Sequence, residues 1–439
     1  MMSIGYKTLA IVGTFLSAQV IHAHSHHHGG GEQTTLSHKE DLDRKWAPEL
    51  SAFASMSTFG GLKHVPCLTT PDELYDIAII GAPFDTATSY RPGARFGPRA
   101  IREASARQVT QRSYNVRAGI NPYMDWAKVI DCGNIPITQM DNKIAEKQML
   151  EAFTELGTRK TAYQQRQDDG TTEKTKRQPR ISDGKPKLVT LGGDHSIILP
   201  VLRALNQIYK KPITVLHFDA HQDTWESSRY DGYWKPEEAG LNHGTWLYHA
   251  TQEGLISNTT SAHAGLRSYL GGADDRDYYT GVEKGFMRIH ADDIDDIGTQ
   301  GIIDKIYSRI GLDPDQPVYL SLDIDVLDPS IAPGTGTPES GGWTSRELAR
   351  ILRGLEKLNI VGADVVEVSP SYDDRGGGTA LAAAHVVNEL IASMVKLGVE
   401  DPDKVGGWFG RKEGGRSIKD GVMDQFQGVF GPAGLDRLL

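Results

Sequence analysis

Short apolar runs alternate with longer amphipathic segments over most of the chain. Eight runs rich in β-branched and other apolar residues have the length of buried strands: residues 75–82, 128–132, 187–192, 213–218, 262–267, 286–290, 317–323 and 361–367. Segments with helix-like spacing lie between most of them: residues 98–106, 141–163, 197–209, 300–310, 345–358 and 381–397. Strands that alternate with helices form parallel sheets with helices on both faces. The pattern therefore predicts an α/β fold.

The N-terminal end of the chain departs from this pattern. Residues 1–23 combine a basic flank, Lys7, with an apolar run too short for a comfortable membrane span, and Ala23 is a suitable small residue before a cleavage site. We interpret this segment as a secretory signal, the alternative being a buried helix. Residues 24–71 are predicted to be an arm. Its start is His-rich, which we interpret as a solvated stretch that binds metal only adventitiously.

Two further segments lie outside the strand–helix pattern. Residues 157–187 contain almost no apolar residue to bury, so we predict a mobile surface insertion. Residues 401–439 are rich in glycine and carry a few aromatic residues, and they are expected to form a C-terminal tail. The main domain is then expected to span residues 72–400.

Composition narrows the class of protein. A chain of 439 residues with 38% hydrophobic residues can bury a substantial core in one large domain. The formal net charge of −10 argues against nucleic acid as a partner and favours a cationic substrate. Cys67 and Cys132 cannot form a disulfide framework, and a single bridge between them is possible but not indicated by the sequence. One glycosylation sequon, residues 258–260, fits a secreted protein.

The candidate chemistry begins where the run at residues 213–218 ends. Asp219, His221 and Asp223 follow it at alternate positions. Side chains at i, i+2 and i+4 of an extended strand point the same way, so these three are predicted to converge at the carboxyl end of a strand. Open α/β sheets bind their ligands at that end. Two carboxylates and an imidazole packed together are unfavourable unless a cation holds them, the alternative being a polar strand end with ordinary hydrogen bonds.

Two other strand ends carry residues of the same kind. One run ends in Gly-Gly-Asp-His with His195, and another ends in Asp323-Ile324-Asp325. The candidate ligands are His195, Asp219, His221, Asp223, Asp323 and Asp325. Four carboxylates and two imidazoles suit two divalent cations. Oxygen-rich ligation with some imidazole and no thiolate favours Mn²⁺, with Ni²⁺, Co²⁺ or Zn²⁺ as alternatives.

Three motifs resemble the signatures of a known family. GGDHS at 192–196, DAHQD at 219–223 and SLDIDVLDPSIAPGTGTPESGG at 321–342 are similar to those of the ureohydrolases, the arginase and agmatinase family, and the resemblance runs from about residue 76 to about residue 397. It implies a three-layer α/β/α domain with an eight-stranded parallel sheet. It also implies a homo-oligomer, a trimer or a hexamer.

The resemblance further implies how the ligands are shared. One Mn²⁺ would be held by His195, Asp219, Asp223 and Asp323, and the other by His221, Asp219, Asp323 and Asp325. Such a pair shares a water that is deprotonated near neutral pH and attacks the guanidinium carbon, which gives urea and an amine.

Three residues are expected to complete the catalytic machinery. His243 matches a family histidine in the mouth of the active site and would be the general acid for the departing amine, although alone we would interpret it as a capping or core histidine. Asp223 would accept the proton of the attacking water. Glu367 matches a family carboxylate that pairs with the substrate guanidinium, the alternative being a structural salt bridge.

The substrate is predicted from further matching segments. GAPFD at 81–85, RPGARFGP at 91–98 and SYD at 371–373 resemble agmatinases and guanidino-acid hydrolases more than arginases. We therefore predict hydrolysis of agmatine to putrescine and urea, with guanidinobutyrate, guanidine or another guanidino acid as alternative substrates. A non-catalytic ligand-binding relative and a secreted protein that binds metal through its His-rich arm are the competing interpretations. We expect no nucleic-acid partner and no membrane span in the mature chain.

Overall fold

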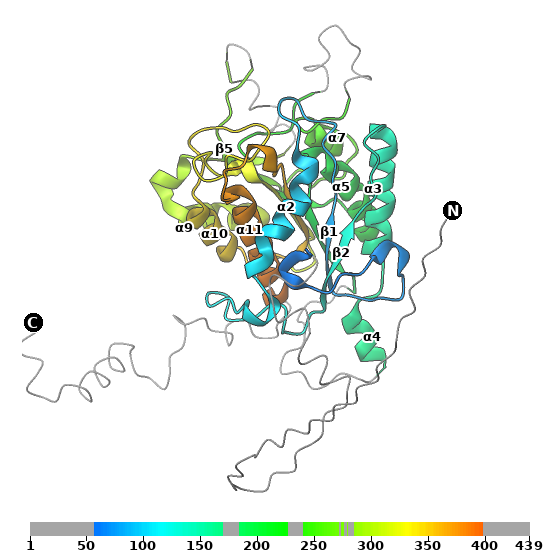
Figure 1. The fold of residues 1–439 in the computed structure, drawn as a ribbon. Coiled ribbons are helices and arrows are strands. Elements are labelled where there is room, and N and C mark those ends of the chain that lie inside the picture. The colour runs from blue at the N-terminus through cyan, green and yellow to red at the C-terminus, as the bar shows by residue number, and fades with distance from the viewer. Residues whose placement is uncertain are drawn as a thin grey trace, which may run out of the picture. The chain divides into compact units, whose positions relative to one another are not determined.

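The sheet is the centre of the molecule. The computed structural model describes residues 57–169, 184–226, 240–271, 274–275, 279 and 285–397. Eight strands form one sheet in the order β2-β1-β3-β8-β7-β4-β5-β6, and every neighbouring pair is parallel (Figure 1). The strands are β1 Ile77–Gly81, β2 Val129–Asn134, β3 Lys187–Leu191, β4 Thr214–Phe218, β5 Ala262–Leu266, β6 Met287–His290, β7 Val318–Asp323 and β8 Ile360–Val366. The prediction of eight parallel strands is confirmed.

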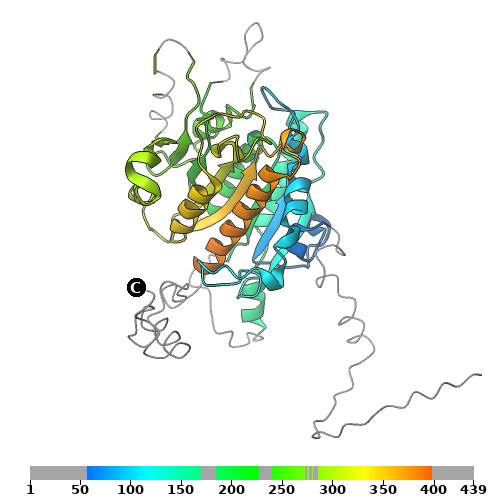
Figure 2. The same cartoon turned by 60° about the vertical axis from the view of Figure 1, so that its left-hand side comes forward.

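Helices cover both faces of the sheet, as expected for three layers (Figure 2). One face carries α2 Gly97–Ala104, α9 Asp293–Ile310, α10 Ser345–Gly354 and α11 Gly378–Leu397. The other face carries α3 Asn142–Gly157, α5 Ile198–Tyr209 and α7 Trp246–Gln252. Each face has its own hydrophobic cluster. Because both faces are covered, strands such as β1, β4 and β8 are buried along their whole length, which is why they are continuous apolar runs in the sequence.

Two helices begin or end at other residues than the sequence pattern predicts. α9 begins at Asp293, seven residues before the predicted start, with three acidic residues in its first turn and a non-helical glycine, Gly298, inside it. α10 is fixed at its start by a capping box between Thr344 and Glu347. It ends at Gly354, four residues before the predicted end.

Two helices were not predicted. α7 has only seven residues, which is too short to show a helical period in the sequence. α4, Ala162–Asp168, lies within the predicted insertion and begins with a capping box between Thr161 and Gln164. The remainder of that insertion, residues 170–183, lies outside the described residues.

A segment before β1 closes one edge of the sheet. Val65 donates its main-chain N–H to the carbonyl of Asp131 in β2, and Asp131 donates its own to the carbonyl of Lys63. Phe59 is fully buried, and its N–H donates to the Asp131 carboxylate. Next to this pairing, Cys67 forms a disulfide with Cys132 of β2, 65 residues further along the chain. This bridge was not indicated by the sequence.

The remaining segment predictions fall largely on residues that the structure does not describe. The signal at residues 1–23, the arm up to residue 56 and the tail at residues 401–439 lie outside the described ranges. Within those ranges, α11 alone is long and apolar enough to cross a membrane, and 67% of its most apolar window is buried inside the protein. It therefore has the burial of a core helix.

Candidate metal centre

The motif residues meet at the carboxyl ends of four adjacent strands. β3, β8, β7 and β4 are neighbours in the middle of the sheet. The predicted residues follow them directly, His195 after β3, Asp219, His221 and Asp223 after β4, Asp323 and Asp325 at the end of β7, and Glu367 after β8. The structure thus brings together side chains that lie up to 172 residues apart in the sequence.

Close packing of main chain positions His195. A Cβ atom on Gly193 would lie 1.8 Å from the carbonyl oxygen of Phe84, so only glycine fits there. Asp194 donates its N–H to the same carbonyl and accepts the N–H of Ser196 on its carboxylate. The short Gly-Gly-Asp segment is therefore fixed on both sides of its bend, and His195 projects over the end of the sheet.

The first half of the centre is gathered around His195. Its Nδ1 lies 3.1 Å from Asp219 Oδ2, 3.2 Å from Asp223 Oδ2 and 3.3 Å from Asp323 Oδ2. All four side chains are at least nine-tenths buried. These are the four residues that the resemblance assigns to one cation.

The second half is gathered around His221. Its Nδ1 lies 3.2 Å from Asp219 Oδ1 and 3.0 Å from Asp325 Oδ2. Asp219 thus turns one oxygen to each imidazole, which is the arrangement expected of a bridging carboxylate. Asp323 Oδ2 faces His195, while its Oδ1 accepts the N–H of Asp325. All six predicted ligands therefore lie in one cluster, and their role as cation ligands stays a prediction.

The geometry of this convergence differs from the strand alternation that we expected. β4 ends at Phe218, so Asp219, His221 and Asp223 lie in the loop beyond it, and Asp223 has a left-handed backbone (φ 54°). Asp325 lies in a 3-10 helix, Ile324–Val326, rather than in β7. The predicted side chains do converge, but not on one face of a strand, because bends in the loops direct them.

The hydrogen-bond network behind His195 determines which of its nitrogens faces the carboxylates. Ser321 Oγ donates to Asp364 Oδ1 and lies 2.7 Å from His195 Nε2. The hydroxyl therefore accepts from Nε2–H, and the lone pair of neutral His195 lies on Nδ1. That lone pair faces three carboxylate oxygens, and within the described part of the chain neither Nδ1 nor Asp219 Oδ2 has a hydrogen-bond partner. Such buried atoms require a proton or a cation between them.

The electrostatics of the cluster lead to the same requirement. Burial raises the pKa of Asp323 well above its ordinary value, and the charges of Asp325 and Asp219 raise it further. Burial also acts to lower the pKa of His195, but the carboxylates of Asp219, Asp223 and Asp323 outweigh it and raise this pKa well above its usual range. Without a cation the centre takes up protons. Its oxygen-rich set with two imidazoles fits divalent cations of the Mn²⁺ type.

Glu367 and His243 form a second group beside the cluster. Glu367 Oε1 accepts the main-chain N–H of His195 at 2.9 Å and lies 3.0 Å from His243 Nδ1. Glu367 Oε2 is buried and has no hydrogen-bond partner among the residues that the structure describes. Like Asp223, Glu367 has a positive φ, 61°. Strained non-glycine backbone of this kind gathers at functional sites.

His243 is held from both ends of its ring. With Nδ1 directed at Glu367, its Nε2 accepts the main-chain N–H of Ser89 at 3.0 Å and lies 2.6 Å from Ser89 Oγ. Burial acts to lower the pKa of His243, but the Glu367 carboxylate outweighs it and the pKa rises to about 9. When Nε2 is protonated, the Ser89 hydroxyl can accept from it. Ser89 is exposed, so this nitrogen lies at the mouth of the site.

Sequence reasoning missed three residues of this site. His217 lies 3.0 Å from Asp219 Oδ2 through its Nε2, and Ser321 and Trp246 contact His195. His217 was detectable, because it precedes Asp219 by two residues in the same alternation. Ser321 opens the motif at 321–342 but is not a ligand-type residue, and Trp246 carries no motif signal that sets it apart from core residues.

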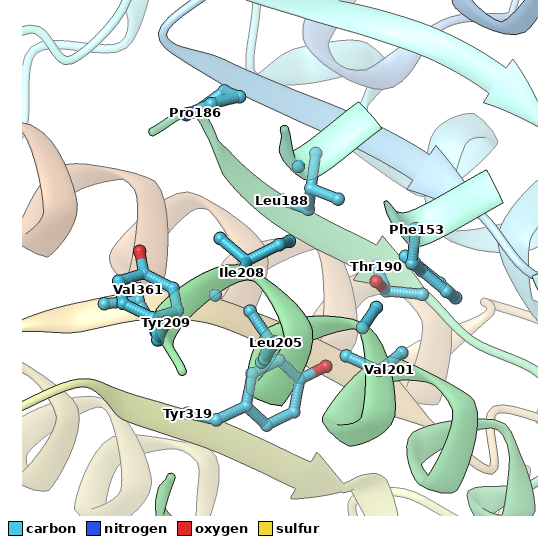
Figure 3. A pocket seen from close by; sticks show the side chains of 13 residues that line it. Phe153, Pro186, Leu188, Thr190, Val201, Leu205, Ile208, Tyr209, Tyr319 and Val361 are labelled. Atoms are coloured by element: carbon cyan, nitrogen blue, oxygen red, sulfur yellow. The ribbon is translucent and has the colours of Figure 1, made fainter. Parts of the chain in front are cut away.

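A separate apolar cavity lies away from this centre (Figure 3). Leu188, Tyr319 and Val361 line it from the amino-terminal halves of β3, β7 and β8, and α5 lines it through Val201 and Leu205. Of the described residues that line this cavity, none is an aspartate, glutamate, histidine, lysine or arginine. It therefore lies at the opposite end of the strands from the polar cluster.

Comparisons with known proteins agree with this geometry. The profile of the arginase family matches residues 75–392. The protein named "Putative agmatinase 1" of Schizosaccharomyces pombe is 48% identical over 352 residues, which cover 80% of this chain and 84% of that protein. The agmatinase of Chromobacterium violaceum is 37% identical and is matched over 73% of this chain and 84% of its own length.

A solved structure shows the same fold. The proclavaminate amidino hydrolase of Streptomyces clavuligerus superposes with a TM-score of 0.64 at 33% identity, covering 79% of this chain and 99% of that one. Together with the sheet order and the His/Asp cluster, these matches confirm the family predicted from the three motifs. The chain belongs to the arginase family as an agmatinase-like ureohydrolase, a hydrolase that acts on carbon–nitrogen bonds of amidines.

Proposed function

We propose that the chain hydrolyses agmatine to putrescine and urea with two Mn²⁺ ions. The observation that carries the proposal is the unpaired, buried Glu367 Oε2 beside the His/Asp cluster. His195, Asp219, Asp223 and Asp323 would hold one cation, and His221, Asp219, Asp323 and Asp325 the other. When bound, the two cations supply a water activated for attack on the guanidinium carbon.

Glu367 orients the substrate in this proposal. A carboxylate matches the planar fork of a guanidinium, and Oε2 is the oxygen left free for it. Oε1 is occupied by His195 N–H and His243 Nδ1, which hold the side chain in place. A Cβ atom on Gly336 would lie 3.2 Å from Oε2, so the absent side chain leaves space beside this oxygen.

His243 supplies the proton for the leaving amine. The Glu367 carboxylate raises the pKa of His243 and so favours its protonated form, and Nε2 lies at the mouth beside Ser89. Glu367 on the Nδ1 side stabilises the imidazolium. A positioned general acid of this kind contributes roughly 10²–10⁴-fold to a rate.

A urea-release screen tests the substrate. The full chain is purified, loaded separately with Mn²⁺, Ni²⁺, Co²⁺ or Zn²⁺, and assayed with agmatine, arginine, 4-guanidinobutyrate, 3-guanidinopropionate and guanidine. The proposal expects the highest kcat/KM with agmatine and Mn²⁺. No urea from any substrate would instead favour a non-catalytic relative, and a preference for another metal would overturn the assignment of Mn²⁺.

A guanidino acid is the second candidate substrate, because the main chain of an arginine, Arg91, lies beside the same glycine as Glu367 Oε2. The Arg91 guanidinium lies 5.1 Å from the ring centroids of both Tyr90 and Tyr372. The Arg91 carbonyl and Glu367 Oε2 both lie within 3.2 Å of the Cβ position of Gly336. An arginine so placed would pair with a substrate carboxylate. A relative named guanidinopropionase, from Pseudomonas aeruginosa, is 34% identical over 82% of this chain.

We also propose that the chain enters the secretory pathway. The signal-like residues 1–23 motivate this, and the Cys67–Cys132 disulfide fits an oxidising compartment. Asn258 of the sequon is exposed in a turn before β5, away from the carboxyl ends of the strands. Secreted protein whose mass falls on treatment with a glycosidase specific for N-linked glycans would support the proposal. Retention of residues 1–23 in the mature chain would contradict it.

The assembly is proposed from the family resemblance. We expect a homo-oligomer, a trimer or a hexamer. Light scattering over micromolar concentrations measures the mass directly, and the mass of a single chain throughout would remove the proposal.

A further inference from the structure

We propose that Trp246 is a positioning residue for the metal centre. Its indole N–H holds the Asp223 carboxylate against His195 and thereby sets how tightly this half of the cluster binds a cation. The inference rests on the proposed metal role of the cluster and adds a residue that no motif assigns.

The polar contact is direct. Trp246 is fully buried, and its Nε1 donates to Asp223 Oδ2 at 2.8 Å. The same oxygen lies 3.2 Å from His195 Nδ1. The oxygen aimed at the ligand nitrogen is therefore the one that the indole fixes. A hydrogen bond to the charged form also favours an ionised carboxylate, which is the form that binds cations.

The start of α7 also holds the backbone of Asp223. The left-handed φ of 54° is strained for a residue with a side chain, so the surrounding structure has to maintain it. Leu247 donates its N–H to the Asp223 carbonyl at 3.2 Å, and Trp246 donates to its carboxylate. Two consecutive residues of α7 thus fix both the main chain and the side chain of one candidate ligand.

The indole ring packs against the two imidazoles of this half. Its centroid lies 4.9 Å from that of His195, tilted by 33°, and 5.4 Å from that of His217, at 78°. A side chain that both orients a carboxylate and packs against the partner imidazole acts as an outer-shell support of the kind that fixes metal ligands.

Trp343 provides a matched control. It is 1% exposed, and its Nε1 donates to a main-chain carbonyl, that of Ala291, at 2.8 Å. Its ring packs on Phe218 at 6.2 Å. Trp246→Phe and Trp343→Phe each remove one buried indole N–H and a similar volume. Only the first removes a hydrogen bond to a candidate ligand.

The experiment measures cation binding without substrate. Chelator-treated wild type and both variants are titrated with Mn²⁺ by calorimetry, and metal content is measured after dialysis. We expect Trp246→Phe to weaken one of the two cation sites by roughly 10–100-fold, the usual effect of losing an outer-shell partner. Trp343→Phe should bind as wild type does while losing comparable thermal stability.

Two outcomes would overturn the inference. Unchanged Mn²⁺ binding in Trp246→Phe would show that the indole N–H does not affect cation binding. If Trp343→Phe weakened Mn²⁺ binding as much as Trp246→Phe does, the effect would come from loss of core packing and not from the hydrogen bond. If wild type binds no cation, the proposed function fails instead.

A second measurement uses wild type, in case Trp246→Phe does not fold. With ¹⁵N-labelled tryptophan, the chain has seven indole N–H groups. An indole N–H bonded to a ligand oxygen must lose its signal when paramagnetic Mn²⁺ binds, because the ion lies next to it. Seven signals that persist in the Mn²⁺-loaded protein would contradict the inference.

Discussion

The two halves of the His/Asp cluster differ in depth and in what supports each imidazole. His195 is 1% exposed, and behind it lie the Ser321 hydroxyl and the buried Asp364 carboxylate. His221 is 12% exposed, and its Nε2 lies 3.4 Å from Glu339, whose side chain is 31% exposed. One half is held by a buried network and the other by a carboxylate at the surface. We therefore expect two cations of unequal affinity, with the one at His221 exchanging first.

Removing the residue shared by both halves should have the largest effect. Asp219→Ala removes both the carboxylate oxygen that faces His195 and the one that faces His221. We therefore expect that neither cation is retained. Because activated water contributes several kcal/mol, urea release should fall by roughly 10³-fold or more. Metal analysis after dialysis, alongside turnover, checks this. A variant that keeps both cations would show that Asp219 does not bridge the halves.

Glu367→Gln separates catalysis from metal binding. The amide keeps the shape and can still accept through one oxygen, but it loses the charge that pairs with a guanidinium. We expect both cations to remain and turnover to fall by roughly 10²–10³-fold, as for other preorganised charge contacts. Wild-type turnover in this variant would mean that another group orients the substrate.

His243→Ala should also spare both halves of the cluster. Loss of the general acid should lower kcat by roughly 10²-fold, and imidazole in the buffer should restore part of it. In wild type, kcat should fall at alkaline pH, where His243, whose pKa the Glu367 carboxylate raises, loses its proton. If kcat of wild type and of the alanine variant has the same dependence on pH, His243 is not the acid.

Glu339→Gln and Ser321→Ala test the asymmetry itself. The first removes the carboxylate beside His221, and the second removes the hydroxyl beside His195. We expect each to weaken a different cation site by roughly 10-fold. Calorimetric titration with Mn²⁺ should therefore change the weaker binding step in Glu339→Gln and the tighter one in Ser321→Ala. The same step changing in both variants would contradict the difference between the halves.

The smallest effect concerns the stability of metal-free protein. The folded-state pKa of His243, about 9, lies above its ordinary value of 6.5. Its protonation therefore stabilises the fold fully below pH 6.5, and this contribution, on the order of 1–3 kcal/mol, is lost as pH rises through 9. Denaturant unfolding of wild type and His243→Gln should show a difference that shrinks between these pH values. If the difference in unfolding free energy between the two proteins were the same at both pH values, protonation of His243 would not stabilise the fold.

Much of the fold was predictable because the strands are apolar runs in the sequence. Every predicted run overlaps one strand, with ends that differ by two residues at most, since strands buried on both faces leave an uninterrupted apolar signal. The six candidate ligands were also detectable, because charged residues that end such runs are conspicuous. The left-handed bend at Asp223 was not, since backbone dihedrals of a loop leave no period in the sequence.

The support of the site was less predictable for the same reason. Trp246 and Ser321 are ordinary core residues by composition, and only the fold brings them to His195. Cys67 and Cys132 are 65 residues apart, and two cysteines alone do not indicate that the first segment lies along β2. Contacts between distant segments depend on the order in which the strands are arranged in the sheet. An apolar pattern predicts the class of the fold but not this order.

The Cys67–Cys132 bridge makes residues 67–132 a covalent ring. The ring encloses β1, α2 and the stretch that carries exposed Tyr114 and Met124. In a chain-entropy description, closing a ring of this size disfavours the unfolded state by about 4 kcal/mol. A protease that cuts the exposed stretch opens the ring and leaves one covalent molecule, whose two pieces separate only after reduction. A nicked chain would therefore keep β1 and β2 attached to each other as long as the bridge stays oxidised.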